Sequence, residues 1–396
     1  MVKKIGYNHL FVPGPTNTPH PVAQAMHVPM EDHRAPDFPQ LLKPLLEGLK
    51  QVFQTEKGEV FIFPATGTAG WECAVCNTLS PGDRVLSYRF GQFSHLWIQS
   101  AQRMGLDVEF YDVQWGEGVP LDHLRTRLEA DRDHRIKALL ICHNETSTGV
   151  TNDLKAIREI LDQTGHPALF MVDGVSSIGS IEFRMDRWGI DVAITGSQKG
   201  FMLPGGNLYI AFSPKALEAS KSAKLPRSFL NIEDQLRANR EGYFPYTPNT
   251  PMLHGLKAVL DRLLAEGMEN VYLRHRRMAE GVRRAVLEGW GLKLCARDPK
   301  WYSDTVTAVV VPEGFDAREV IRIAYHRYNL SLGGGLGEVA GKVFRIGHLG
   351  EPNELMLAAA ICGAEAAMRD VGIGVEAGSG VAAAMEYWRA TAPPCR

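Results

Sequence analysis

Asp173 and Lys199 are two residues whose types and positions in the chain suggest chemistry. Asp173 directly follows the apolar run 168–172, and Lys199 follows the run 192–195 in the turn Gly196-Ser197-Gln198-Lys199-Gly200. Alone, each has an ordinary explanation, since Asp173 could cap a helix and Lys199 could lie in a solvated loop. Together they suit a cofactor with a pyridine ring, because a carboxylate keeps the ring nitrogen protonated and an amine forms an imine. Burial would lower the pKa of Lys199 toward the value that a nucleophile needs.

A third feature suggests an anion site. The stretch Thr66-Gly67-Thr68 follows the apolar run 60–64 and opens a helical pattern. Backbone N–H groups at the start of a helix attract phosphate, and small residues let it approach closely. No Gly-Lys-Ser/Thr follows, so the stretch is not a P-loop. A plain helix cap explains it equally well when it is taken alone.

Short apolar runs must position these groups. They alternate with helical patterns, which favours βα units and a mostly parallel sheet. Because the runs are continuously apolar, we expect strands covered on both faces. Ligands gather at the carboxyl ends of such strands, where Asp173 and Lys199 would lie. The runs are Val60–Pro64, Val85–Tyr88, Val108–Tyr111, Ala138–Cys142, Ala168–Val172, Val192–Thr195 and Leu208–Phe212.

The remaining patterns predict a second α/β region. Residues 11–39 read as an extended arm and a loop, and residues 252–289 as long helices broken near Gly267. After a helix at about Phe38–Gln54, the later elements are a strand at Val306–Val311, a helix at about Ala317–Arg327, a glycine loop at 333–337, a strand at Val343–Ile346 and a helix from about Asn353. We therefore expect an N-terminal arm (1–20), a large domain (21–265), a small domain (266–375) and a peripheral tail (376–396).

Composition narrows the class of protein further. The chain has 396 residues, ordinary globular composition and a formal net charge of −2, which favours neither nucleic acid nor a membrane surface as a partner. The first residues carry lysines without an apolar run behind them, so we expect no secretory signal. Six cysteines in a chain of this size do not form a disulfide framework, and a cytoplasmic protein is the default expectation.

The motifs, in order, resemble those of the class V aminotransferases, and specifically the serine–glyoxylate and alanine–glyoxylate branch. The resemblance runs from the start motif at Phe11 to about residue 370. It rests on Phe11-Val12-Pro13-Gly14-Pro15-Thr16-Asn17, Asp32-His33-Arg34, Ala65-Thr66-Gly67-Thr68, Asn144-Glu145-Thr146-Ser147-Thr148-Gly149, Val172-Asp173, Gly196-Ser197-Gln198-Lys199-Gly200 and Arg345-Ile346-Gly347-His348-Leu349-Gly350. It implies an α/β protein of fold type I among the pyridoxal-phosphate-dependent transferases.

The resemblance also implies roles around the cofactor ring. Lys199 matches the lysine that forms a Schiff base with pyridoxal phosphate, and Asp173 matches the aspartate that pairs with the pyridine nitrogen. Phe93 matches an aromatic residue stacked on the ring, although an ordinary core phenylalanine is the alternative. Thr146 matches a small hydroxyl residue beside the ring.

Further implied roles concern the phosphate, the substrate and the subunit interface. Thr66, Gly67, Thr68 and Gln198 match the phosphate cradle. Tyr246 and Thr250 match residues that reach the phosphate from a neighbouring subunit, which implies a homodimer with active sites at its interface. Arg345 matches the arginine that binds the substrate α-carboxylate, which suits a planar guanidinium. Gly14 and Arg34 are further substrate-binding candidates, although Arg34 could instead tie the arm to the neighbouring subunit.

The implied activity is transfer of an amino group from a small L-amino acid to glyoxylate, which gives glycine and a 2-oxo acid by a ping-pong mechanism. Serine is the favoured donor, and alanine or aspartate stays open. The second carboxylate of aspartate would need a cation, for which Arg34 is a candidate; His348 is another polar candidate. After Lys199, the loop Met202-Leu203-Pro204-Gly205-Gly206 departs from the expected pattern by an extra glycine.

Three alternatives remain at this stage. A cysteine desulfurase-like lyase would need a mobile cysteine, for which Cys295 is the candidate, and a non-catalytic protein could bind the cofactor on the same fold. A nicotinamide-dependent enzyme is disfavoured because the glycine run at 333–337 is not a Gly-x-Gly-x-x-Gly fingerprint. No metal site is expected, since Cys73 and Cys76 have no second pair and His20, His27 and His33 lack ligand spacing.

Overall fold

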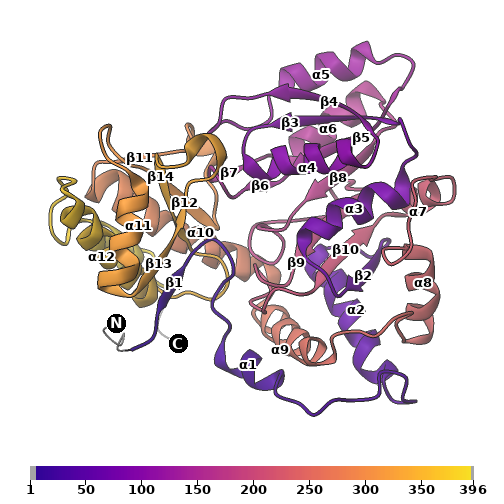
Figure 1. Ribbon diagram of the computed structural model, residues 1–396, viewed down its shortest axis with the longest axis horizontal. Coiled ribbons are helices and arrows are strands. Elements are labelled where there is room, and N and C mark those ends of the chain that lie inside the picture. Colours follow the sequence, from indigo (N-terminus) through magenta and orange to yellow (C-terminus); the bar gives the residue numbers. More distant parts are fainter. Residues whose placement is uncertain (1–5, 394–396) are drawn as a thin grey trace.

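The larger of two main β-sheets organises the molecule. The computed structural model describes residues 6–393, and Figure 1 shows one sheet on each side of the view. The seven-stranded sheet has the order β2-β10-β9-β8-β5-β3-β4. All neighbours are parallel except that β10 runs antiparallel to both β2 and β9. The strands are β2 (Glu59–Phe63), β3 (Arg84–Arg89), β4 (Asp107–Asp112), β5 (Ile136–Cys142), β8 (Leu169–Asp173), β9 (Val192–Gly196) and β10 (Leu208–Phe212).

Helices cover both faces of this sheet, as the continuous apolar runs predict. Along β2, Phe61 and Phe63 pack on one face, while Val60 and Ile62 pack on the other. Helices α3 (Gly67–Thr78), α4 (Gln92–Arg103), α7 (Pro214–Ser220) and α8 (Ile232–Glu241) contribute to the first core. Helices α2 (Pro39–Phe53), α5 (Leu121–Ala130), α6 (Leu154–Thr164) and α9 (Thr250–Glu266) contribute to the second.

The smaller sheet has the order β1-β13-β14-β12-β11. Its strands are β1 (His9–Phe11), β11 (Lys293–Leu294), β12 (Val306–Val310), β13 (Leu330–Gly334) and β14 (Val343–Gly347). Helices α10 (Met268–Arg284), α11 (Ala317–Tyr328), α12 (Glu354–Val371) and α13 (Ser379–Ala390) pack around a separate apolar core on this sheet. Glu145 lies in a two-stranded pair, β6 (Asn144–Glu145) with β7 (Val150–Thr151).

The structure differs from the expected arm, glycine loop and tail at specific places. Strand β1 pairs in parallel with β13, so the start of the chain is part of the small sheet. A short helix, α1 (His20–Ala25), interrupts the segment expected to be an arm and a loop. Gly333 and Gly334 belong to β13 rather than to a loop. Residues 1–5 and 394–396 of the expected arm and tail lie outside the described residues.

The described part of residues 376–396, which we expected to be a peripheral tail, contains a packed helix. Helix α13 packs on the small core, where Trp388 is only 1% exposed and donates its indole N–H to the carbonyl of Arg277 at 3.1 Å. An Ala-rich sequence offers few large apolar side chains and so does not suggest a core helix. Small side chains nevertheless let a helix pack closely, and Trp388 supplies the large buried side chain here.

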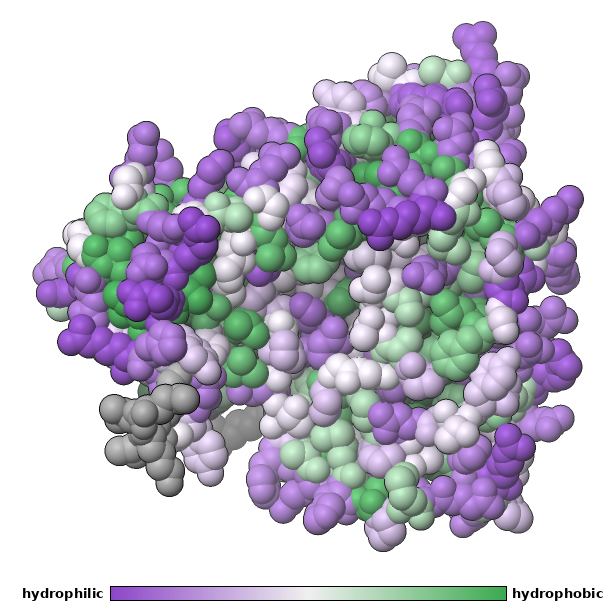
Figure 2. Space-filling model, viewed as in Figure 1, coloured by the Kyte–Doolittle hydropathy of each residue, from purple (hydrophilic) through white to green (hydrophobic). Residues whose placement is uncertain are grey.

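Two further observations concern the surface and the cysteines. No helix within residues 6–393 is long and apolar enough to cross a membrane, and Figure 2 shows hydrophilic side chains along much of the periphery of this face. The five cysteines in the described part of the chain are free thiols.

Candidate active site

A cavity of about 190 Å³ lies at the carboxyl ends of β5, β8 and β9. Parallel strands place the residues that follow them at one edge of the sheet, so side chains far apart in sequence meet there. The sequence-predicted residues that line this cavity are Gly14, Thr66, Gly67, Thr68, Phe93, Thr146, Asp173, Gln198 and Lys199. The prediction that Asp173 and Lys199 share one sheet edge is confirmed.

Asp173, the last residue of β8, is a buried carboxylate held by two donors. The indole N–H of Trp71 donates to Oδ2 at 2.9 Å, and the backbone N–H of Val175 donates to Oδ1 at 2.9 Å. Burial raises the pKa of Asp173 to about 6, although both hydrogen bonds oppose the rise. The carboxyl is therefore mostly ionised near neutral pH and has a fixed orientation.

Lys199 lies in the turn after β9, with its side chain 9% exposed. Its Nζ donates to the carbonyl of Pro13. Burial lowers the pKa of Lys199 to about 8; the nearby Arg345 guanidinium lowers it further, and Asp173 opposes this. An appreciable fraction of the amine is therefore neutral near pH 8, as a nucleophile and a proton carrier require.

The loop after Lys199 is anchored despite its extra glycine. Ser197 Oγ donates to the carbonyl of Pro204 at 2.6 Å and accepts from the backbone N–H of Asn207 at 3.1 Å. Met202 N–H donates to the carbonyl of Lys199 at 2.9 Å. Gly206 has a φ of 147°, which L side chains rarely adopt, so the second glycine serves the turn.

Gly14 lies directly against Lys199. Its φ is 114°, and a Cβ atom at this position would overlap Nζ and Cδ of Lys199. Thr16 ties the same segment to the lysine turn, because its N–H donates to the carbonyl of Gln198 at 3.1 Å and its hydroxyl donates to that of Lys199 at 3.2 Å. The segment from β1 to α1 therefore forms one wall of the cavity.

The first turn of α3, where we expected an anion site, lines the cavity. Thr66 occupies the N-cap position without a side-chain capping bond, and the first N–H groups of a helix have no acceptor within it. A larger residue does not fit at Gly67, because a Cβ atom there would lie 2.5 Å from Val175 Cγ2. The Oε1 atom of Gln198 is buried and has no hydrogen-bond partner among the described residues.

Arg345, on β14 of the small sheet, does not line the cavity itself but binds a residue that does. Its Nε donates to the carbonyl of Gly334 at 2.8 Å, and its Nη1 donates to the carbonyl of Thr146, a cavity residue, at 3.0 Å. Burial lowers the pKa of Arg345 to about 10, and Glu145 opposes this, so the guanidinium stays charged at neutral pH. A substrate carboxylate is the anion that this arrangement suits.

Other predicted residues lie outside this cavity. Arg34 is exposed, Tyr246 is 41% exposed, and Thr250 is buried with a hydroxyl that lacks a partner within residues 6–393. His348 is buried between Thr307 Oγ1, at 2.9 Å, and the carbonyl of Asp304, at 3.1 Å. Burial lowers the pKa of His348 to about 3, so it supplies no positive charge at neutral pH.

Sequence reasoning missed several polar residues of the site. Trp71 reads as part of an apolar helix face, yet its indole N–H faces Asp173. Asn144 and Ser176 line the cavity, and Ser176 Oγ accepts from both Asn144 Nδ2 and the Thr146 hydroxyl at 2.8 Å. The position of Trp71 four residues after Gly67, and hence on the same helix face, is the one signal that could have indicated its role.

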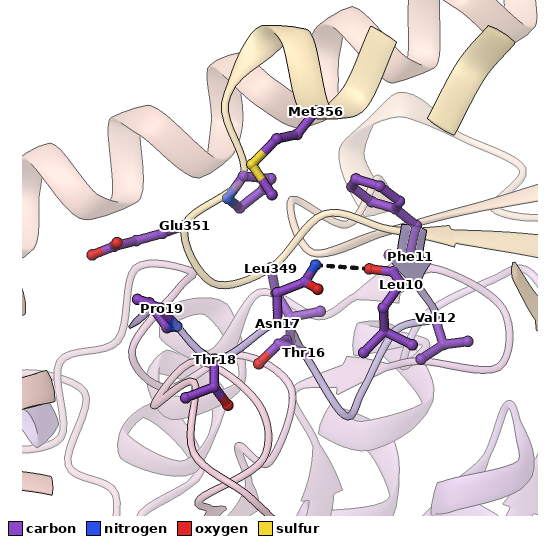
Figure 3. A pocket seen from close by; sticks show the side chains of 12 residues that line it. Leu10, Phe11, Val12, Thr16, Asn17, Thr18, Pro19, Leu349, Glu351 and Met356 are labelled. Atoms are coloured by element: carbon purple, nitrogen blue, oxygen red, sulfur yellow. Dashed lines mark hydrogen bonds between the residues drawn. The ribbon is translucent and has the colours of Figure 1, made fainter. Parts of the chain in front are cut away.

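A second cavity, of about 250 Å³, lies on the other side of the N-terminal segment. Figure 3 shows its side chains, with Asn17 donating to the carbonyl of Leu10 and Met356 pointing across from the small domain. Its one acidic side chain, Glu351, is paired with Arg262 at 2.7 Å. This cavity offers no group for chemistry comparable to the Asp173–Lys199 pair.

Comparison with known proteins agrees with this site. A family model for class-V aminotransferases matches residues 9–336. The buried amine and carboxylate at the sheet edge place the chain among the pyridoxal-phosphate-dependent enzymes of fold type I. It belongs to the class-V aminotransferase family, so it is a transaminase and pyridoxal phosphate is its cofactor.

Relatives with assigned activities cover nearly the whole chain. The chain is 54% identical over 382 residues to a serine–glyoxylate aminotransferase of Hyphomicrobium methylovorum, which covers 96% of this chain and 94% of that protein. It is 54% identical over 384 residues to an L-aspartate–glyoxylate aminotransferase of Paracoccus denitrificans, covering 97% of each. The crystal structure of a pyridoxamine–pyruvate aminotransferase from Mesorhizobium loti superposes with a TM-score of 0.90 at 27% identity, covering 98% and 99% of the two chains.

The residues present fit pyridoxal phosphate at each of its ends. Asp173 is a buried, largely ionised acceptor for a pyridine N–H, and Lys199 is a buried amine with a lowered pKa for the aldehyde carbon. The start of α3, whose first N–H groups lack acceptors within the helix, and the Gln198 side chain, whose NH₂ group can donate, suit the phosphate end. Phe93 supplies an aromatic wall of the same cavity.

Proposed function

We propose that this transaminase moves the amino group of serine to glyoxylate. The observation that carries the reaction type is the meeting of Asp173 and Lys199 in one buried cavity, with Arg345 at its edge. Glyoxylate as acceptor is supported by the relatives from Hyphomicrobium and Paracoccus, whose names both specify it. Those two relatives are equally similar to this chain and differ in donor, so the choice of donor rests on the site itself.

The roles of the residues follow from their positions. Pyridoxal phosphate, when bound, withdraws electrons from the bonds at the substrate Cα. Asp173 holds the proton on the ring nitrogen, and Phe93 limits movement of the ring. Arg345 binds the substrate α-carboxylate and so fixes which bond at Cα is aligned for reaction. Lys199 Nζ, when it is not covalently bound, accepts the Cα proton of the amino donor and later delivers a proton to the glyoxylate carbon that becomes Cα of glycine.

Serine fits the polar character of the cavity. Besides the residues at the phosphate end, the hydroxyl side chains of Thr146 and Ser176 line it, and they suit a hydroxymethyl group. Aspartate would bring a second carboxylate, but within residues 6–393 Lys199 is the one cationic residue that lines the cavity, with Arg345 beside it. Both already have roles, and neither Arg34 nor His348 contributes a charge to this cavity.

The direct test is a donor screen with glyoxylate as acceptor and purified holoenzyme. Hydroxypyruvate, pyruvate and oxaloacetate are followed separately as products of serine, alanine and aspartate. We expect the highest kcat/KM with serine, and parallel lines in double-reciprocal plots of a ping-pong reaction. A larger kcat/KM with aspartate would refute the donor assignment. Arg34→Gln should change the kcat/KM for serine by less than about twofold, as expected of a surface charge.

The proposal includes a homodimer whose sites are completed across the interface by Tyr246 and Thr250. Support comes from an exposed aromatic pair, Tyr246 and Phe229, whose tilted rings have centroids 5.5 Å apart and which are each 41% exposed. Neither Tyr246 nor Thr250 lines the cavity of its own chain. An exposed aromatic cluster of this kind suits contact with a second copy.

A subunit-mixing experiment tests this arrangement. Lys199→Ala and Tyr246→Phe chains are each assayed alone at limiting cofactor and then co-expressed. If Tyr246 acts across the interface, one site of each mixed dimer is intact and activity rises above that of either parent. If mixing restores nothing while dimers form normally, Tyr246 does not act in the partner's site.

The position of Cys295 argues against the alternative of a cysteine desulfurase. Cys295 is 8% exposed, and burial raises the pKa of its thiol to about 11. It packs in a small apolar cluster with Ala308, Val339 and Val343 of the small domain. A thiol so placed is neither mobile nor ionised at neutral pH, so it is unsuited to receive sulfur.

A further inference from the structure

Glu145 is a fully buried carboxylate next to the cofactor cavity. Its Oε2 accepts from the backbone N–H of Phe93 at 3.0 Å and from that of Ser94 at 2.9 Å. Its Oε1 accepts from the backbone N–H of Ser147 at 3.1 Å and from the Ser147 hydroxyl at 2.7 Å. A buried carboxylate is tolerated only when its oxygens are satisfied in this way.

These bonds hold the first turn of α4 in place. Phe93 and Ser94 belong to that turn, whose N–H groups lack acceptors within the helix. Ser147 Oγ extends the same network, because it accepts from the backbone N–H of Gln92 at 2.9 Å. The glycine at position 91 is required by this arrangement, since a Cβ atom there would overlap the Glu145 side chain. Phe93 is the residue of this turn that lines the cavity.

Glu145 also connects to the substrate side of the cavity. The next residue, Thr146, lines the cavity, and its carbonyl accepts from Arg345 Nη1 at 3.0 Å. Arg345 and Glu145 interact electrostatically, since the Glu145 carboxylate partly offsets the lowering of the Arg345 pKa by burial. Glu145 therefore supplies a nearby negative charge to a buried guanidinium without occupying the face that a substrate carboxylate needs.

We infer that Glu145 is a positioning residue for both the cofactor and the substrate: it fixes Phe93 against the cofactor ring and Thr146 against Arg345. It touches neither reactant, and it acts through the first turn of α4 and the β6 backbone. The inference rests on the proposed site but not on the identity of the donor.

Glu145→Gln tests this role while keeping the size of the side chain. One carboxylate oxygen becomes an NH₂ group, which faces N–H donors on whichever side it points. We expect the dissociation constant of the apoprotein for pyridoxal phosphate to rise about tenfold, as expected for losing a charge-assisted hydrogen bond. The circular dichroism of the bound cofactor should weaken, because Phe93 no longer has one position, and the KM for the donor should rise.

Glu365→Gln is a matched control. Glu365 is also a buried carboxylate, 4% exposed, and it accepts from Trp290 Nε1 and from the backbone N–H of Gly380 at 3.0 Å, but it lies in the small-domain core. Its substitution should lower the melting temperature and leave the cofactor dissociation constant and dichroism unchanged. If Glu145→Gln shows the same pattern as this control, the inference is overturned.

A milder variant covers the case in which Glu145→Gln does not fold. Ser147→Ala removes the hydroxyl between Glu145 Oε1 and the Gln92 N–H but keeps the carboxylate. We expect about a threefold rise in the cofactor dissociation constant, a smaller effect because one neutral hydrogen bond is lost. An unchanged constant and dichroism in Ser147→Ala would also overturn the inference. If wild-type protein binds the cofactor but transfers no amino group to glyoxylate, the proposed function fails while this binding test still stands.

Discussion

Trp71 donates its indole N–H to the carboxylate of Asp173 at 2.9 Å. The two residues come from different elements, since Trp71 lies in α3 and Asp173 ends strand β8. In the proposed function, one helix therefore serves both ends of the cofactor: its first turn binds the phosphate, and its second turn orients the carboxylate that pairs with the ring nitrogen.

Trp71→Phe should remove one hydrogen bond to the Asp173 carboxylate and weaken cofactor binding without abolishing it. A hydrogen bond to a charged group contributes about 1.5–3 kcal/mol, so the cofactor dissociation constant should rise about tenfold or more. Trp97→Phe is the control, because Trp97 stacks on Trp71 with centroids 6.3 Å apart and its buried indole N–H has no partner among the described residues. Equal cofactor binding by the two variants would contradict a role for the Trp71 bond.

The raised pKa of Asp173 predicts a pH dependence of apoprotein stability. The folded pKa of about 6 exceeds the ordinary value of 3.8, so the folded state binds more protons between these values. Protonated Asp173 therefore stabilises the folded state fully below about pH 3.8, and this stabilisation is lost as the pH rises through 6. For a pKa shift of this size, the free energy of unfolding falls by about 3 kcal/mol. Urea unfolding of apoprotein and of Asp173→Asn from pH 4 to 7 measures it. In Asp173→Asn this pH-dependent part of the free energy of unfolding should be absent. An equal pH dependence in the two proteins would contradict the raised pKa of Asp173.

Arg345→Gln should impair substrate binding rather than cofactor binding. Removing a buried charged partner of a carboxylate costs several kcal/mol, so the KM for the amino donor should rise about 100-fold or more. Arg345→Lys should recover little, because an ammonium group cannot reproduce two directed N–H bonds. Arg318→Gln, at a side chain 75% exposed, is the control. A KM within about threefold of wild type for Arg345→Gln would remove this residue from the substrate site.

Gly14→Ala should reduce activity through a direct clash with Lys199. The added Cβ would overlap Nζ and Cδ of Lys199, and φ at this position is 114°. We expect kcat to fall about 100-fold, because small displacements of a reacting group have effects of this size. Gly105→Ala controls for backbone strain alone, since Gly105 has a φ of 83° but open space around it. It should cost about 1 kcal/mol of stability and leave kcat unchanged.

The parts of the site that sequence predicted are those set by local pattern. Continuous apolar runs predict strands buried on both faces, and parallel strands bring Asp173 and Lys199 to one edge. The order of the sheet places β10 antiparallel between β2 and β9, which no run of residues signals. The boundaries 21–265 and 266–375 stay predictions.

The parts that sequence did not predict depend on contacts between distant segments. Trp71 and Glu145 act through partners that are neighbours only in the folded chain. Strand β1 is three residues long, and its pairing with β13 has no local signature. Helix α13 was missed because its small side chains suggest no core, although Trp388 packs against α10.

The central claim is that Lys199 forms the covalent bond to pyridoxal phosphate. Borohydride reduction of the holoenzyme, followed by proteolysis and mass spectrometry, makes that bond permanent and locates it. We expect the cofactor mass on the peptide that contains Lys199 and on no other peptide, and we expect Lys199→Ala to bind the cofactor noncovalently without turnover. A reduced cofactor on another lysine, or near-normal transamination by Lys199→Ala, would contradict the central claim.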